Sequence, residues 1–256
     1  MESYRKIDSS LARQIKLIMT DVDGTMTSPD DSINPIIYKL VRSLDSLGVT
    51  IGLVSGRSLP SLERLIHSLE MGGPIIGEHG GVAKLNVDQE GLELGYSQEA
   101  SLMALNKLQR LYPNRVRGLP YNKNRLVDVV FEADGISVEE LTSHLNGVDL
   151  VDSGYMLHLL PEGVSKGTTL KRLIGIMSKL TPADVMVIGD YITDLSLFEH
   201  FSHSVLVANP KLPQGQRHLL ETTARFGSNQ PYSGGFIEVI NHLLKLLSGE
   251  EADYHG

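Results

Sequence analysis

The chain has 256 residues, of which 41% are hydrophobic, and its 23 lysines and arginines stand against 31 aspartates and glutamates, a net charge of −8. This length is enough for a large domain and a smaller one. An acidic chain offers no broad attraction to nucleic acid or to an anionic membrane surface, because both need clustered lysine and arginine. We therefore expect neither as a partner.

The chain contains no cysteine, which excludes disulfides, thiol nucleophiles, iron–sulfur clusters and cysteine-based zinc sites. This composition favours the cytoplasm. No apolar run reaches the roughly 18 residues of a membrane span, and charged residues interrupt positions 1–20. We accordingly expect neither a membrane anchor nor a signal peptide.

Short apolar runs alternate with longer stretches of helical periodicity, which is the pattern of a parallel sheet covered by helices on both faces. In chain order, strands are expected at 15–19, 49–54, 74–77, 185–188 and 204–207, and helices at 35–47, 59–69, 167–179 and 235–247. The predicted fold class is therefore α/β, with a doubly wound, Rossmann-like core. The polar segment 248–256 is expected to be a frayed tail.

The middle of the chain follows a different pattern. It predicts, in order, a helix at 99–111, strands at 115–118 and 126–131, a helix at 138–145, and strands at 149–152 and 155–160. This αββαββ order suits a small antiparallel sheet backed by two helices and inserted between strands of the larger sheet. We therefore expect a core of residues 1–83 and 162–256 and an inserted cap of residues 84–161.

Polar segments follow three of the expected strands, at the edge where ligands bind in open parallel sheets. These segments are Asp21-Val22-Asp23-Gly24-Thr25, Ser55-Gly56-Arg57 and Gly189-Asp190-Tyr191-Ile192-Thr193-Asp194. Lys166 stands at the start of a helix directly after the inserted block. Each segment alone is typical of a turn. Their order along the chain, each after a strand, favours one shared site.

Such a set has the chemistry of phosphoryl transfer. Asp21 and Asp23 can supply a nucleophile and an acid/base. A carboxylate about 4 Å from a phosphate dianion meets a repulsion of about 8 kcal/mol at an effective dielectric constant near 20, so a cation is required. Asp21 and Asp190 offer the hard oxygen ligands that Mg²⁺ prefers. Lys166 adds a fixed positive charge, and Ser55 with the backbone N–H groups that follow it can hold phosphoryl oxygens.

Asp194 has three roles open to it at this stage. It could bind the metal directly, orient another ligand, or cap the next helix. We favour the orienting role.

The motifs resemble those of the haloacid dehalogenase superfamily, whose phosphatases carry DxDxT/V, a serine or threonine after the second strand, a lysine and an acidic GDxxxD motif. The resemblance implies that Asp21 forms an aspartyl-phosphate and that Asp23 is the acid/base. The long interval between Ser55 and Lys166 corresponds to a cap inserted after the second motif. By the same resemblance, Ser55 and Lys166 bind phosphate, and Asp190 and the backbone carbonyl of Asp23 bind Mg²⁺. Gly56 and Thr193 are further candidate phosphate-binding residues, and Asp21 and Asp194 are further candidate metal ligands.

The class of substrate stays open. The segment Gly77-Glu78-His79-Gly80-Gly81 resembles both the ENG segment of phosphoglycolate and sugar phosphatases and the xHG segment of trehalose 6-phosphate phosphatases. Thr193, where many relatives have asparagine, favours the second group, and the segment Pro231-Tyr232-Ser233-Gly234-Gly235-Phe236 favours the first. Glu78 and His79 are candidate substrate contacts.

The expected cap carries a basic segment in which Arg115, Arg117, Lys123 and Arg125 have no acidic residue between them. Either these side chains form a solvated surface, or the three arginines hold a carboxylate on the leaving group of the substrate. The second interpretation favours phosphoglycolate-type substrates over neutral sugar phosphates.

We therefore expect a Mg²⁺-dependent phosphomonoesterase that acts on a small phosphorylated metabolite, as a monomer or homodimer. Two alternatives remain: a phosphotransferase or mutase that uses the same aspartyl-phosphate, and a non-enzymatic phospho-acceptor. The sequence has no Walker loop, no GxGxxG after a strand and no GxSxG motif. Nucleotide hydrolysis by a P-loop, dinucleotide redox chemistry and serine hydrolase chemistry are therefore disfavoured.

Overall fold

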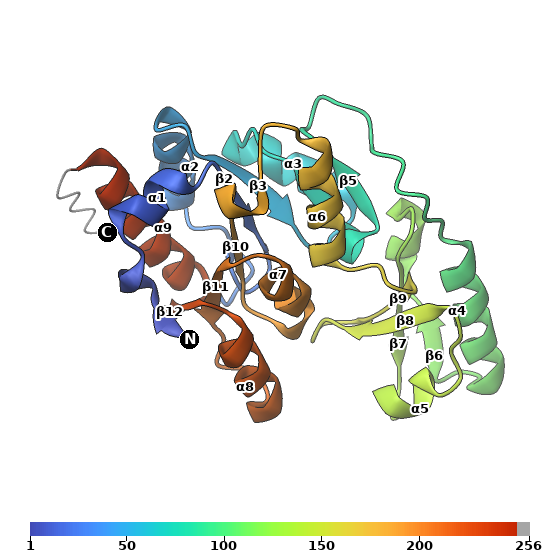
Figure 1. Cartoon of the computed structure of the whole chain (residues 1–256). Helices are drawn as coiled ribbons and strands as arrows, with labels where there is room; N and C mark the ends of the chain where they lie inside the picture. The colour runs from blue at the N-terminus through green and yellow to red at the C-terminus, as the bar shows by residue number, and fades with distance from the viewer. Residues whose placement is uncertain (250–256) are drawn as a thin grey trace.

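The computed structural model describes residues 1–249. Its centre is an eight-stranded sheet in the order β1-β12-β11-β10-β2-β3-β4-β5 (Figure 1). The central strands are β2 (Leu17–Thr20), β3 (Thr50–Val54), β4 (Ile75–Gly77), β10 (Val185–Gly189) and β11 (His203–Ala208). These five strands pair in parallel, so their carboxyl ends lie at one edge of the sheet.

The outer strands of this sheet were not predicted from the sequence. β1 (Glu2–Ser3) and β12 (Phe226–Pro231) extend one side in parallel, and β5 (Val82–Lys84) pairs antiparallel with β4 on the other side. The composition of β12 is typical of a loop, yet its Ser228 hydroxyl accepts a hydrogen bond from the Ala208 N–H at 2.9 Å. Because β5 ends at Lys84, the large sheet reaches one residue past the expected boundary, and the division into core and cap stays a prediction.

Helices cover both faces of the large sheet. One face carries α1 (Ser9–Gln14), α2 (Ile36–Ser46), α3 (Leu59–Leu69) and α9 (Tyr232–Ser248), and the other carries α6 (Lys166–Ile176), α7 (Leu195–His200) and α8 (Gln214–Thr223) (Figure 1). Each face buries its own apolar cluster, which includes Phe236 on the first and Phe198 on the second. The predicted doubly wound α/β fold is thus confirmed.

Three of these helices, α1, α7 and α8, were not expected, because α1 and α7 span 6 residues each and α8 is rich in polar side chains. Ser248 ends α9, and the rest of the expected tail from residue 250 onward lies outside the described residues. Within residues 1–249, no helix combines the length and the apolar character that a membrane crossing requires.

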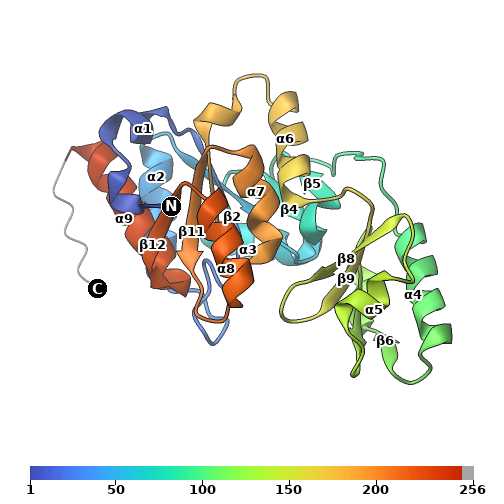
Figure 2. The same ribbon diagram turned by 60° about the horizontal axis from the view of Figure 1, so that its bottom comes forward.

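A second sheet of four antiparallel strands lies beside the first, in the order β6-β7-β9-β8 (Figure 2). Its strands are β6 (Val116–Gly118), β7 (Val129–Ala133), β8 (Val148–Asp152) and β9 (Leu157–Pro161), and its helices are α4 (Glu99–Leu111) and α5 (Val138–Thr142). Leu108, Phe131 and Leu159 belong to its own apolar cluster. The αββαββ order is the predicted one.

Short 3₁₀ turns complete the chain: η1 (Tyr4–Lys6), η2 (Glu78–Gly80), η3 (Pro120–Asn124), η4 (Pro182–Asp184) and η5 (Ile192–Asp194). The turn η2 explains one misplaced boundary. A strand was expected from residue 126, but β7 begins at Val129, because the N–H groups of residues 126–128 donate to the Glu78 carboxylate rather than to a neighbouring strand.

Candidate active site

The expected site residues converge at the carboxyl edge of the parallel strands. Asp21 follows β2, Ser55 follows β3, Asp190 follows β10, and Lys166 is the first residue of α6. All four are buried. Backbone hydrogen bonds fix the first two, since the Asp21 N–H donates to the Ile188 carbonyl and the Ser55 N–H continues the ladder to β4.

The Lys166 ammonium joins two carboxylates from different elements. Its Nζ lies 2.6 Å from Asp21 Oδ1 and 2.6 Å from Asp194 Oδ1. The other oxygen of Asp194 accepts the N–H groups of Asp190 and Tyr191. Asp194 therefore has a cation on one oxygen and two backbone N–H groups on the other, whereas the oxygens of Asp190 accept one neutral donor each; this difference favours the orienting role for Asp194.

Two residues that the sequence analysis did not assign hold Asp190. The Thr25 hydroxyl donates to Asp190 Oδ1 at 2.7 Å, and the Asn209 amide donates to Oδ2 at 2.6 Å. Asn209 directly follows β11, so the strand-end rule that selected the other residues also points to it. Gly24, at φ +85°, leaves room for this carboxylate, because a Cβ there would lie 2.4 Å from Asp190 Oδ2.

The cluster of Asp21, Asp190 and Asp194 holds more negative charge than Lys166 can neutralise. Ligand oxygens of Asp21, Asp190 and Asp194 lie within 4.8 Å of one another, and Lys166 is the cation that pairs with two of them. Burial raises the pKa of Asp21 well above its usual range although Lys166 opposes the shift, and burial together with Asp194 raises the pKa of Asp190 to about 7. Burial lowers the pKa of Lys166, but Asp194 and Asp21 outweigh it and the net shift is upward.

These carboxylates fit a magnesium ion. Magnesium prefers hard oxygen ligands and is commonly held by one or two carboxylates. Asp21 and Asp190 offer such oxygens in a buried cluster whose formal charge is negative. A bound divalent cation would oppose the burial and the mutual repulsion that raise the pKa values of both groups.

Asp23 is held by an arginine whose role the sequence analysis missed. Arg57 Nε lies 2.9 Å from Asp23 Oδ2, and Arg57 Nη2 lies 2.5 Å from Oδ1. This two-pronged ion pair is partly exposed. Arg57 stands in the Ser55-Gly56-Arg57 segment, so its place after β3 was the available signal.

A cavity of about 300 Å³ opens above the cluster and lies between the two sheets. Its lining residues are Asp21, Asp23, Asp31, Ser55, Gly56, Arg57, His79, Arg125, Ser153, Tyr155, Met156, His158, Lys166, Tyr191 and Thr193. All four expected phosphate-binding residues and both expected catalytic aspartates are among them. Five residues of the expected cap line one side of this cavity: Arg125, Ser153, Tyr155, Met156 and His158.

Glu78 has a different position from the one expected. Its carboxylate is fully buried and accepts the N–H groups of Leu126, Val127 and Asp128 at 2.9–3.1 Å. Burial raises its pKa, and these N–H donors oppose the rise. Glu78 does not line the cavity; it joins the edge of the large sheet to the start of β7. We therefore correct its assignment from substrate contact to structural link.

The three arginines of the basic segment separate in space. Arg115 donates to the carbonyl oxygens of Asp134 and Gly135, and Arg117 is 73% exposed and lies 3.8 Å from Glu132. Neither lines the cavity, so their assignment as substrate-binding residues is corrected. Arg125 does line it.

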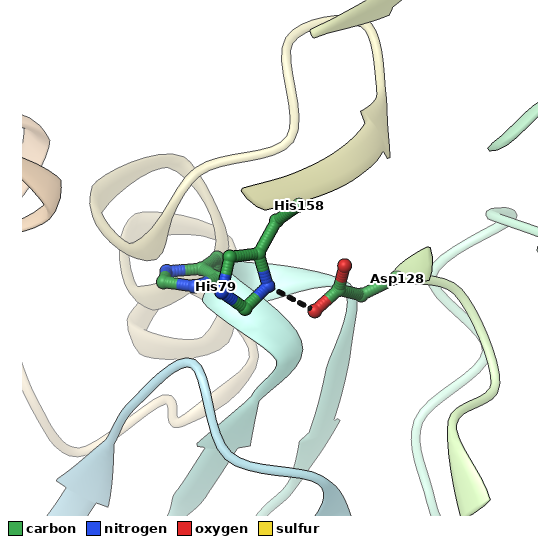
Figure 3. Close-up of side chains that lie close together, drawn as sticks. All are labelled: His79, Asp128 and His158. Carbon is green, nitrogen blue, oxygen red and sulfur yellow. Dashed lines mark hydrogen bonds and ion pairs between the residues drawn. The ribbon is translucent and has the colours of Figure 1, made fainter. Parts of the chain in front are cut away.

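His79 lies in the cavity wall against a histidine of the small sheet. The rings of His79 and His158 meet edge to face at 4.3 Å, and His158 Nδ1 lies 2.7 Å from Asp128 (Figure 3). Neither ring nitrogen of His79 has a hydrogen-bond partner within the described residues. Burial lowers the pKa of His79 well below its usual value, and His158, Lys166 and Arg125 add to the shift.

Comparison with known proteins shows which family has this architecture. The model of the haloacid dehalogenase-like hydrolase family matches residues 18–115 and 120–212. A phosphoglycolate phosphatase of Methanoculleus marisnigri is 31% identical over 239 residues, which are 91% of this chain and 98% of that protein. A phosphoglycolate phosphatase of Methanospirillum hungatei is 27% identical over 87% of this chain and 94% of its own.

Solved structures share the fold. A crystal structure of a Thermoplasma acidophilum protein has a TM-score of 0.77 and 25% identity, and the match covers 91% of this chain and 99% of that one. The sucrose-phosphatase of Synechocystis, solved with sucrose and phosphate, has a TM-score of 0.69 and 18% identity over 90% of this chain and 98% of its own. The second likeness concerns the fold alone.

An α/β sheet with an acidic site at its carboxyl edge, and a cavity between that sheet and a smaller one, is the arrangement of a phosphatase-type hydrolase. The chain belongs to the haloacid dehalogenase-like hydrolase family. The resemblance inferred from the motifs and the expected class of enzyme, a phosphatase of this family, are thereby confirmed.

Proposed function

We propose that the chain is a Mg²⁺-dependent phosphomonoesterase that hydrolyses a small phosphorylated metabolite, phosphoglycolate or a sugar phosphate, through an aspartyl-phosphate on Asp21. One observation carries this proposal. Asp21 lines the cavity with one oxygen held by Lys166, whereas its Oδ2 accepts no hydrogen bond from the described residues. A fixed carboxylate with one uncommitted oxygen at the base of a cavity is arranged as a nucleophile.

The phosphoryl group needs donors around it. Lys166, the Ser55 hydroxyl and Thr193 line the cavity next to Asp21. The Gly56 N–H donates no hydrogen bond within the described residues and is available to a phosphoryl oxygen. Asp21, Asp190 and the backbone carbonyl of Asp23 would hold Mg²⁺, which supplies the positive charge that lets a carboxylate approach a phosphate dianion.

The proposed reaction has two steps at phosphorus. Asp21 Oδ2 forms a bond to phosphorus while the bond to the ester oxygen breaks, and Asp23 gives its proton to that leaving oxygen. Asp23 then takes a proton from water as the water oxygen attacks phosphorus, which frees Asp21 and releases phosphate. In this structure Asp23 is engaged by Arg57, so an incoming phosphoryl group, with its higher charge, competes for that arginine.

A phosphate-release screen with Mg²⁺ tests the proposal. The substrates are phosphoglycolate, sucrose 6-phosphate, trehalose 6-phosphate and hexose phosphates. We expect release that needs Mg²⁺ from at least one of them, and strongly slowed turnover in Asp23→Asn. Phosphosugar isomerisation in place of release would favour a mutase, and stable phosphorylation without turnover would favour a phospho-acceptor. We also keep as proposals a cytoplasmic location and a monomeric or homodimeric state.

A further inference from the structure

One wall of the cavity carries a guanidinium edge that has no partner. The Arg125 side chain is 7% exposed, and its Nη1 donates to the Gly56 carbonyl and pairs with Asp128. Its Nε and Nη2 have no hydrogen-bond partner within residues 1–249. Nε has almost no accessible surface, so Nη2 is the donor that a ligand in the cavity can reach.

His79, from the turn η2 of the large-sheet side, presents a second group without a partner near Arg125. It is 5% exposed, and both ring nitrogens lack hydrogen bonds within the described part of the chain. The ring packs directly on Gly56, where an added Cβ would lie 2.3 Å from His79 Nε2. Figure 3 shows it edge to face with His158. A buried polar group of this kind costs free energy unless a ligand supplies its partner.

Without a ligand, the positive side chains around His79 are already paired with carboxylates. Asp128 offsets Arg125, and the Lys166 ammonium is engaged by Asp21 and Asp194. A carboxylate that binds Arg125 adds one negative charge beside two imidazoles. A proton on one of them would offset that charge, and His79 is the one whose nitrogens are uncommitted, because His158 already contacts Asp128 and Ser153.

We propose that Arg125 and His79 form a subsite for a carboxylate on the leaving group, so that the preferred substrates are phosphate esters of small hydroxy acids. This rests on the proposed phosphatase activity. Arg125 binds the carboxylate through Nη2, and the His79 ring, whose nitrogens are covered in the empty cavity, shifts to donate a hydrogen bond to it. Binding takes up one proton from solvent onto His79. The phosphoryl group occupies the neighbouring part of the cavity, at Asp21 and Lys166.

The groups around His79 explain why it takes up a proton when a carboxylate binds. Burial, with His158, Lys166 and Arg125 nearby, keeps the pKa of His79 well below its usual value in the free protein. Asp128 is the acidic side chain of this wall, and the Glu78 carboxylate is occupied by backbone N–H groups. A bound carboxylate raises the pKa of His79, so it binds more tightly as the pH falls.

The same residues could be read as a metal site, because ligand atoms of His79, Asp128 and His158 lie within 4.8 Å of one another. The charges oppose that reading. The Arg125 guanidinium already contacts Asp128, and the Lys166 ammonium adds to the positive surroundings of His79. A divalent cation would have to compete with the Arg125 guanidinium for Asp128, which is the one carboxylate of this trio.

The test compares phosphoglycolate with its uncharged amide, phosphoglycolamide, in the full-length protein with Mg²⁺. We expect kcat/KM to favour phosphoglycolate by about ten- to hundredfold. Arg125→Gln and His79→Asn should each lower this ratio about tenfold or more, and asparagine suits the positive φ of residue 79. Arg117→Gln, which changes an exposed arginine outside the cavity, should leave the ratio unchanged.

The pH profile separates a carboxylate contact from a merely structural role. The ratio of the two KM values, phosphoglycolate over amide, should rise with pH in the wild type by up to about tenfold per unit and stay flat in His79→Asn. Equal kcat/KM for acid and amide, with hydrolysis of both, would overturn the subsite while leaving the phosphatase proposal intact. Hydrolysis of neither ester, nor of any sugar phosphate, would overturn the phosphatase proposal itself. Tight Zn²⁺ binding that His79→Asn abolishes would assign the cluster to a metal and refute the subsite.

Discussion

Replacing Lys166 by methionine should destabilise the protein strongly. The Lys166 side chain is 2% exposed, and its Nζ lies 2.6 Å from a carboxylate oxygen of Asp21 and of Asp194. Methionine removes the positive charge and leaves three buried carboxylates together. Breaking a buried ion pair on one side costs about 3–5 kcal/mol. For a chain of this length, that corresponds to a fall in Tm on the order of 10 °C.

The effect should depend on pH and on metal. Lys166 lowers the pKa of Asp21, so its loss raises that pKa further and the variant takes up protons on folding. The penalty should therefore be larger near pH 8 than near pH 6, and added Mg²⁺ should recover part of it. Urea denaturation with EDTA and with Mg²⁺ measures both, with Lys107→Met as the exposed control. A Lys166→Met variant within about 1 kcal/mol of the wild type at pH 8 would refute this reasoning.

Three further predictions concern neighbouring contacts. Glu78→Gln should lower the free energy of unfolding by about 2 kcal/mol and raise KM, because it weakens the acceptor of three backbone N–H groups. A variant that matches the wild type in urea denaturation and in KM would contradict this. Gly56→Ala should reduce kcat/KM, because its Cβ would displace His79, while Gly72→Ala, with open space around it, serves as the control in the same assay. Burial raises the pKa of Asp190 to about 7, so a metal must displace a proton below that pH. The rise in Tm caused by Mg²⁺ should therefore grow from about pH 5.5 to about pH 8, and a constant rise would count against Asp190 as a ligand.

The convergence of the acidic and phosphate-binding residues was predictable from the sequence because parallel strands bring their carboxyl ends to one edge. Asp21, Ser55 and Asp190 each directly follow a strand, and the structure brings them together. The large sheet's outer strands were not predictable in the same way. β1 has two residues and β12 contains Gly, Ser, Asn and Pro, so neither has the apolar run that marks a buried strand.

Contacts between distant side chains were beyond the sequence. The hydrogen bond from Thr25 to Asp190 joins residues 165 positions apart and depends on how the turn after β2 curls. The arginines of the basic segment illustrate the same limit, because the sequence did not indicate which of them point toward the cavity. Val116 points into the apolar cluster of the small sheet, so Arg117, the next residue along the strand, must point away from it. Their spacing alone gave no such orientation.

The account depends most on covalent chemistry at Asp21, and an acid-quenched reaction analysed by peptide mass spectrometry tests it directly. With Mg²⁺ and 4-nitrophenyl phosphate, whose leaving oxygen needs no proton, the Asp23→Asn variant should accumulate a peptide that contains Asp21 and carries the mass of one added phosphoryl group, because the step that needs Asp23 as base is slowed. Asp21→Asn should show no such peptide and no turnover. Near-normal phosphate release by Asp21→Asn, or a phosphoryl group on a different residue, would contradict the proposed mechanism.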